Sequence, residues 1–125
     1  MAVTHPTAVR TGIADFVVDQ LDEGTPPGLL VFQTAGSVTV ATLTFSNPAF
    51  GGAVAGVATA SAITSDTNAA GGTTTKAELR NAAGTPKILC SVTATGGGGD
   101  ITLSSAIISA GQTVSMTSLT YTATP

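Results

Sequence analysis

The sequence predicts a mainly β protein, an antiparallel β-sandwich preceded by one N-terminal α-helix. Apolar residues recur at helical spacing only before residue 24, and from residue 29 onward they alternate with Thr and Ser at a period of two. Seven or eight alternating segments follow at roughly ten-residue spacing, with Gly-rich turns between them, which is typical of sandwiches and barrels. Eight strands with bends would also suit a jelly roll.

The first element is predicted to be a helix over residues 6–22. Pro6 suits the first helical position, because the N–H that it lacks would be unpaired there. Gly24 and the Pro26-Pro27-Gly28 run end the helix. The apolar stripe expected to face the core is Val9, Ile13, Phe16, Val17 and Leu21. The chain therefore divides into a helix or arm, residues 1–24, and a sandwich domain, residues 25–125; the helix packs either on this sandwich or on a neighbour.

The remaining chain is predicted to form strands at residues 29–34, 38–45, 54–63, 101–108 and 114–123, together with a hairpin over residues 73–94. The apolar parity slips inside 38–45, where Val38 and Val40 share one face and Leu43 and Phe45 share the other. It slips again in the last strand. A slip of this kind predicts a bulge or a strand that bends between two sheets.

The hairpin over residues 73–94 is the clearest unit, because folding it about Ala83-Gly84 brings its two apolar faces together. The inward pairs are Leu79 with Ile88, Ala77 with Cys90, and Thr75 with Val92. The same register places Arg80 opposite Lys87, and like charges directly opposite one another destabilise a strand pair.

The composition excludes several classes of function. Charged residues make up 9% of the chain, against about 25% in an ordinary soluble domain, and the net charge is −3. An acidic chain lacks the basic footprint that nucleic-acid binding needs. No apolar run reaches the roughly 18 residues that span a membrane, and MAVTHPTAVR lacks the pattern of a secretory signal. A single cysteine excludes an internal disulfide and fits synthesis in a reducing cytoplasm.

Residues with the chemistry of an active site are scarce. His5 and Cys90 are the only histidine and cysteine, too few for a zinc site, and no base is in sight to activate Cys90. Asp66 and Asp100 lie in predicted turns without the alternating acidic spacing of a calcium loop. The run Gly96–Gly99 lacks the Lys-Ser/Thr pair of a phosphate loop and is interpreted as a strand connector, or as a tip that contacts a neighbouring subunit. We predict no catalytic residue, cofactor or metal ligand, and no enzymatic activity.

Two charge groups are the candidate partner contacts. The acidic flank of the helix either faces solvent or docks onto a basic partner; like charges one turn apart do not stabilise the helix itself. The basic group on the outward face of the hairpin is either a chance arrangement or awaits an anion or an acidic surface, such as the helix of a neighbouring copy in a homo-oligomer. The acidic group is Asp15, Asp19, Asp22 and Glu23, and the basic group is Lys76, Arg80 and Lys87.

Four segments carry a resemblance to a known group of proteins: TGIADFVVDQLDEG, LLVFQTAG, ATLTFSNPAFG and KAELRNAAGTPKILCSVTATGGGGD. They resemble small virion proteins encoded in the structural gene cluster of tailed bacteriophages. Such proteins include capsid decoration (cement) proteins, which are often sandwiches or jelly rolls, and head–tail and tail components. The similar residues are packing and turn residues, so the resemblance implies no catalytic residue.

The resemblance implies a structural protein of the virion, assembled in the cytoplasm of the bacterial host. The function expected is capsid decoration, in which many copies bridge capsid subunits; the partners are then the major capsid protein or other virion proteins. The alternative within this class is a tail or head–tail junction component. The alternative from another class is a fibre or adhesin module for host glycans, which usually needs exposed aromatic residues; the chain has no Trp and one Tyr, Tyr121.

Overall fold

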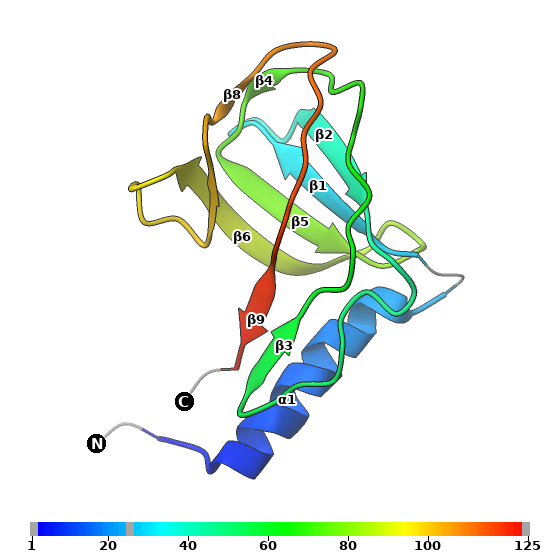
Figure 1. The fold of residues 1–125 in the computed structure, drawn as a ribbon, viewed down its shortest axis with the longest axis vertical. Coiled ribbons are helices and arrows are strands. Elements are labelled where there is room, and N and C mark those ends of the chain that lie inside the picture. Colours follow the sequence, from blue (N-terminus) through cyan, green and yellow to red (C-terminus); the bar gives the residue numbers. More distant parts are fainter. Residues whose placement is uncertain (1–2, 25–26, 124–125) are drawn as a thin grey trace.

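The computed structural model, which describes residues 3–24 and 27–123, is mainly β with one long helix (Figure 1). The predicted helix is confirmed: α1 spans Thr7–Asp19 and continues as a 3-10 turn over Gln20–Asp22. Pro26 of the predicted helix stop and the domain boundary at residue 25 lie outside the described residues. The strands are β1 (Leu29–Gln33), β2 (Thr39–Thr44), β3 (Val57–Thr59), β4 (Gly72–Thr73), β5 (Lys76–Arg80), β6 (Pro86–Ala94), β7 (Ile101–Leu103), β8 (Ile107–Ile108) and β9 (Thr120–Thr122).

The strands form one main sheet and two small ones. The main sheet has the order β2-β1-β5-β6-β7, and the other strands pair as β3-β9 and β4-β8. Figure 1 shows the main sheet strongly curled, with β9 and the long segment leading to it crossing the sheet. The expectation of a wholly antiparallel sheet is wrong, because β7 runs parallel to β6.

The register predicted for the hairpin is confirmed except next to the turn. Leu79 lies opposite Ile88 as expected, but a bulge after Leu79 places Arg80 opposite Pro86, so the like-charge pair with Lys87 does not form. The turn causes this shift, since the buried Asn81 side chain accepts the Thr85 amide at 2.9 Å and fixes a five-residue turn.

The other end of the hairpin departs from the expected alternation of faces. Thr74 is buried and Thr75 is exposed, the reverse of the predicted pattern. The backbone keeps the predicted register, since the Val92 amide donates to the Thr75 carbonyl at 3.0 Å. Thr74 is the buried residue, and its amide donates to the Ala106 carbonyl beside β8 at 2.8 Å.

The bulge predicted in the second strand is confirmed. Phe32 of β1 lies opposite Ala41 and Gln33 lies opposite Thr39, so Val40 is the extra residue. The predicted strand 101–108, in contrast, is divided into β7 and β8. Ser105 explains the division, because its Oγ accepts the Ile107 amide and donates to the Ile107 carbonyl, local bonds that compete with a ladder.

The Gly-rich run makes the parallel β6–β7 pair possible. A parallel partner normally requires a crossover of a dozen or more residues, yet only residues 95–100 separate these two strands. Gly96 and Gly98 adopt positive φ angles of 92° and 79°. A Cβ on Gly97 would lie 2.7 Å from the Thr93 side chain. The run is therefore a compact return that packs on Thr93, and glycine is required for two different reasons at alternating positions.

One apolar core joins the helix to the sheet, so the helix packs on its own chain. The residues buried in it are Ala14 and Val18 of α1 and Leu21 of the 3-10 turn. Leu21 was expected there, but the expectation for Val9 and Phe16 is wrong, because their side chains are 46% and 68% exposed. The helix is rotated relative to the orientation that its apolar stripe predicts.

Replacing Gly97 by Ala should lower the free energy of unfolding by about 1–3 kcal/mol, the usual cost of forcing extra atoms into a packed site. Gly52→Ala is the matched control, because a Cβ there would meet nothing within 4 Å. Urea denaturation measures both variants. If residues 95–100 pack on Thr93 as described, only Gly97→Ala should lose stability. Equal stability of the two variants would contradict this packing.

Candidate functional site

The acidic flank of α1 binds the backbone of the same chain. Asp15 Oδ1 accepts the Ala53 amide at 2.7 Å, and Asp22 Oδ1 accepts the Ala49 amide at 2.9 Å. One turn before Asp15, Thr11 Oγ1 accepts the Gly56 amide at 3.0 Å. The segment 49–56 therefore runs antiparallel to the helix, in agreement with its course beside α1 in Figure 1.

This arrangement explains why the helix is rotated. Thr11 and Asp15 lie one turn apart on α1, next to the buried Ala14 and Val18, and Asp22 follows at the end of the 3-10 turn. The segment 49–56 lies outside the main sheet, so most of its amides need acceptors other than a strand. Charge-assisted bonds from carboxylates meet that need, and they hold this face inward at the expense of Val9 and Phe16.

Two further aspartates accept amides at the edges of the main sheet. Asp66 Oδ2 accepts the Thr42 amide of the edge strand β2 at 2.9 Å. Asp100 Oδ2 accepts the Ser91 amide at 2.9 Å, immediately before β7 joins β6. These contacts occupy strand edges that would otherwise offer unpaired N–H groups to another chain. Both aspartates, considered as calcium ligands and set aside on spacing, have a structural use here.

The basic residues of the hairpin also have partners within the chain. Lys87 Nζ lies 2.7 Å from Glu23 Oε1, and Arg80 Nε donates to Glu78 Oε1 at 2.8 Å. The ammonium group of Lys76 donates to Ser37 Oγ at 2.5 Å. The predicted meeting of the acidic helix with the basic hairpin thus occurs in one chain through Glu23 and Lys87; the same contact between copies stays a prediction.

The Glu23–Lys87 pair has an electrostatic signature. The hydrogen bond and the positive charge of Lys87 lower the pKa of Glu23, and Asn81 contributes a smaller effect in the same direction. A lowered pKa means that the pair stabilises the fold above the ordinary carboxyl pKa, and that this contribution is lost as the pH falls through the lowered value.

Most charged side chains consequently have a partner within the chain. Of the eleven charged side chains, only Arg10 and Asp19 form no hydrogen bond or ion pair with the residues that the structure describes. The exposed large apolar side chains, by contrast, are Val3, Val9, Phe16, Val38, Val54, Leu89 and Ile107. Sequence reasoning missed this feature, because it assigned the outward positions to Thr and Ser.

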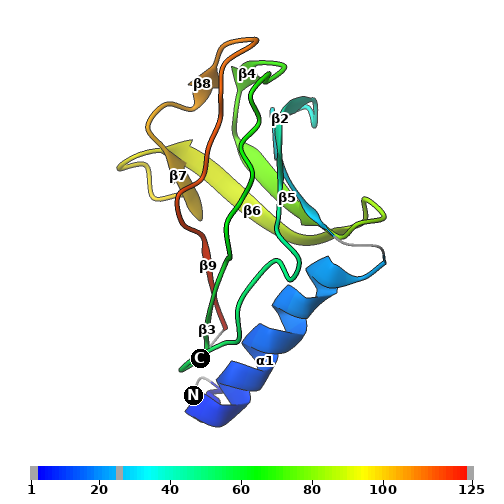
Figure 2. The same cartoon turned by 45° about the vertical axis from the view of Figure 1, so that its right-hand side comes forward.

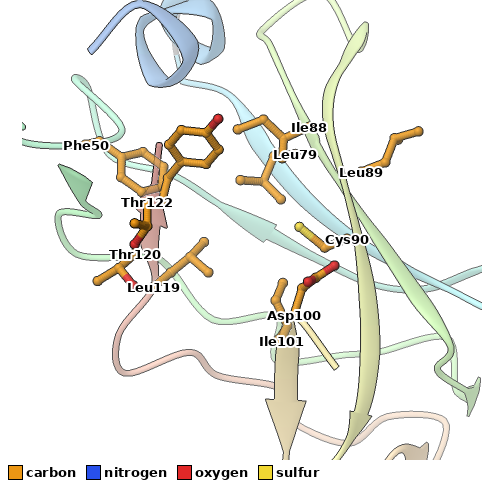
Figure 3. A pocket seen from close by; sticks show the side chains of 11 residues that line it. Phe50, Leu79, Ile88, Leu89, Cys90, Asp100, Ile101, Leu119, Thr120 and Thr122 are labelled. Carbon is orange, nitrogen blue, oxygen red and sulfur yellow. The ribbon is translucent and has the colours of Figure 1, made fainter. Parts of the chain in front are cut away.

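A cavity of about 400 Å³ lies between the β5–β6 hairpin and β9. Figure 3 shows Phe50 on one side of it and Cys90 with Asp100 on the other, and Tyr121 also lines it. Burial raises the pKa of the Cys90 thiol, and the negative charge of Asp100 raises it further. The thiol is therefore protonated at neutral pH, which is the opposite of what a nucleophile needs. The walls of the cavity come from segments far apart in the chain, so no local sequence signal could reveal it.

Within residues 3–24 and 27–123, no group of three or more His, Cys, Asp or Glu side chains is arranged to hold a metal ion. In the same ranges, no helix has both the length and the apolar character needed to cross a membrane.

Comparison with known proteins gives no relative: no protein-family model, curated protein or solved structure matches this chain. The functional interpretation therefore depends on its own residues and on the resemblance described above.

Substituting a carboxylate tests directly whether the hydrogen bonds from Asp15 and Asp22 hold the segment 49–56 in place. Asp22→Ala should lower the free energy of unfolding by about 1–3 kcal/mol, because the amide of the fully buried Ala49 loses its acceptor. Asp19→Ala, an exposed aspartate on the same helix, should change it by less than about 0.5 kcal/mol. Thermal or urea unfolding compares the two variants. An equal loss of unfolding free energy in both would show that the charge of the helix matters rather than the hydrogen bond to Ala49.

Lys87→Gln should raise the pKa of Glu23 toward the ordinary carboxyl value, because both main causes of the lowered value come from Lys87. An NMR titration of the Glu23 carboxyl carbon measures this. Lys76→Gln, which breaks a contact with Ser37 instead, is the control and should leave the Glu23 titration unchanged. An unaltered Glu23 pKa in Lys87→Gln would rule out the ion pair in solution.

Proposed function

We propose that this chain is a structural virion protein of a tailed bacteriophage, and that it decorates the outer capsid and bridges capsid subunits. The observation that carries the proposal is the surface. Nearly all charges are engaged within the chain, while seven large apolar side chains are exposed. Charged residues are only 9% of the chain, so covering this surface with another protein strips few ions of water and loses little hydration energy.

The mechanism would be additive. A standard interface of roughly 1,600 Å² is enough for specific binding, and the symmetry of a capsid repeats it at every site. The exposed apolar residues fall both in the β region, at Val38, Leu89 and Ile107, and on or beside the helix, at Val9, Phe16 and Val54. A chain with apolar residues in two regions can contact two neighbours at once, as a bridging protein must.

The finer fold assignment belongs to the same proposal. A sandwich or jelly roll is typical of decoration proteins, and the single core shared by the curled sheet and the β3-β9 and β4-β8 pairs supports this description. A tail or head–tail junction component would have a similar surface, and copy number separates the two roles.

One observation favours a function from another class. The cavity beside Tyr121 and Phe50 has a volume within the usual range of ligand pockets, roughly 300–1,000 Å³, and both rings line it. An adhesin module for host glycans would use these rings for sugar stacking. Clear hits on a glycan array, lost in Tyr121→Ala, would favour this function over decoration.

Particles that lack this chain should release their genome at a lower temperature, and adding the purified chain back should restore the original value. Dye access to DNA during heating measures the release. Quantitative mass spectrometry should find hundreds of copies per particle, whereas about six or twelve would indicate a junction. Unchanged stability of particles without the chain would contradict the decoration role.

A further inference from the structure

The outward face of α1 carries two exposed apolar side chains, Val9 and Phe16. Val9 and Phe16 are seven residues apart, which is two helical turns, so they lie on the same face. Gly12 lies between them, and a Cβ there would meet nothing within 4 Å. Figure 2 shows α1 at the periphery of the molecule, with β3 and β9 on one side and its other side open.

This face cannot be explained as a helix that has turned away from its core. The opposite face is held by the three hydrogen bonds of Thr11, Asp15 and Asp22 to the segment 49–56. Ala14 and Val18 are fully buried on that side. Rotating Phe16 inward would break these bonds and expose Val18, so the exposed apolar pair is a fixed property of the fold.

The spacing on this face is complementary to itself. A two-fold axis beside Gly12 would place Val9 of one helix against Phe16 of an antiparallel second helix, and Phe16 against Val9. The large ring thus meets the smaller side chain at both ends. Glycine at the centre lets the two backbones approach closely, where packed helix axes are about 8–10 Å apart.

The charges on the helix favour the same antiparallel orientation. Asp19, three residues after Phe16, is an exposed carboxylate without a partner in the described part of the chain. The start of the helix has no side-chain cap and no acidic residue in its first turn, so no carboxylate of that turn offsets its positive dipole end. The two-fold arrangement brings Asp19 of each copy to the start of the other helix near Pro6. A parallel pair would place the two Asp19 carboxylates side by side.

We propose that α1 pairs in antiparallel fashion with α1 of a second copy of this chain, through Val9, Gly12 and Phe16. A helix of 13 residues is about 20 Å long, so one helix face buries less than the roughly 800 Å² per partner of a standard interface. The dimer is therefore weak and forms at high local concentration, as on a particle. The proposal does not depend on the decoration role.

The affinity test measures dimerisation of the purified chain by sedimentation equilibrium up to about 1 mM, the concentration range of weak complexes. Phe16→Asp should weaken the dimer at least tenfold. The matched control is Leu89→Asp, which changes a side chain of similar exposure on the sheet and should leave the dimer unchanged. A chain that stays monomeric throughout, or an equal effect of the two variants, would overturn the proposal. Either failure leaves the particle stability test untouched, so the two proposals can fail separately.

The orientation test uses single cysteines in a Cys90→Ala background, which removes the one natural thiol. Mixing Val9→Cys with Phe16→Cys under mild oxidation should give the mixed disulfide faster than either variant links to itself, because an antiparallel pair brings these two positions together. Faster self-linking of Val9→Cys would indicate a parallel pair and would overturn the proposal.

Discussion

The structure depends on aspartate side chains that accept hydrogen bonds from backbone amides without a partner in a neighbouring strand. Asp15 and Asp22 hold the segment 49–56 against the helix, and Asp66 and Asp100 occupy the edges of β2 and β6. A small sheet with much irregular chain leaves many amides without ladder partners, and a buried amide without an acceptor is costly. The scarce carboxylates of this chain are placed where that cost would otherwise arise.

This use of charge determines the character of the surface. Charged side chains are few and most are engaged within the chain, so small polar side chains with apolar residues among them make up most of the exterior. The proposed contact with other proteins rests on this exterior. The Cys90 thiol carries no charge either. Burial and the negative charge of Asp100 raise its pKa and keep it protonated.

How much the sequence could predict differs between elements for physical reasons. Local alternation determines the faces of a hairpin, so the pairing of Leu79 with Ile88 followed from the pattern, as did a bulge or bend within residues 38–45, where the structure has a bulge at Val40. The position of Lys87 did not, because a side-chain bond of Asn81 sets the turn. The rotation of the helix could not be predicted either, since Asp15 and Asp22 find their acceptor amides 38 and 27 residues away.

Amide hydrogen exchange tests the central claim most directly. The amides of Ala49, Ala53 and Gly56 belong to no strand, yet the aspartate and threonine acceptors should protect them from exchange. We predict protection at these three amides that approaches the level of the strand amides in β1 and β5. Exchange as fast as that of an exposed loop, while the sheet remains protected, would contradict the claim that helix side chains hold this segment in place.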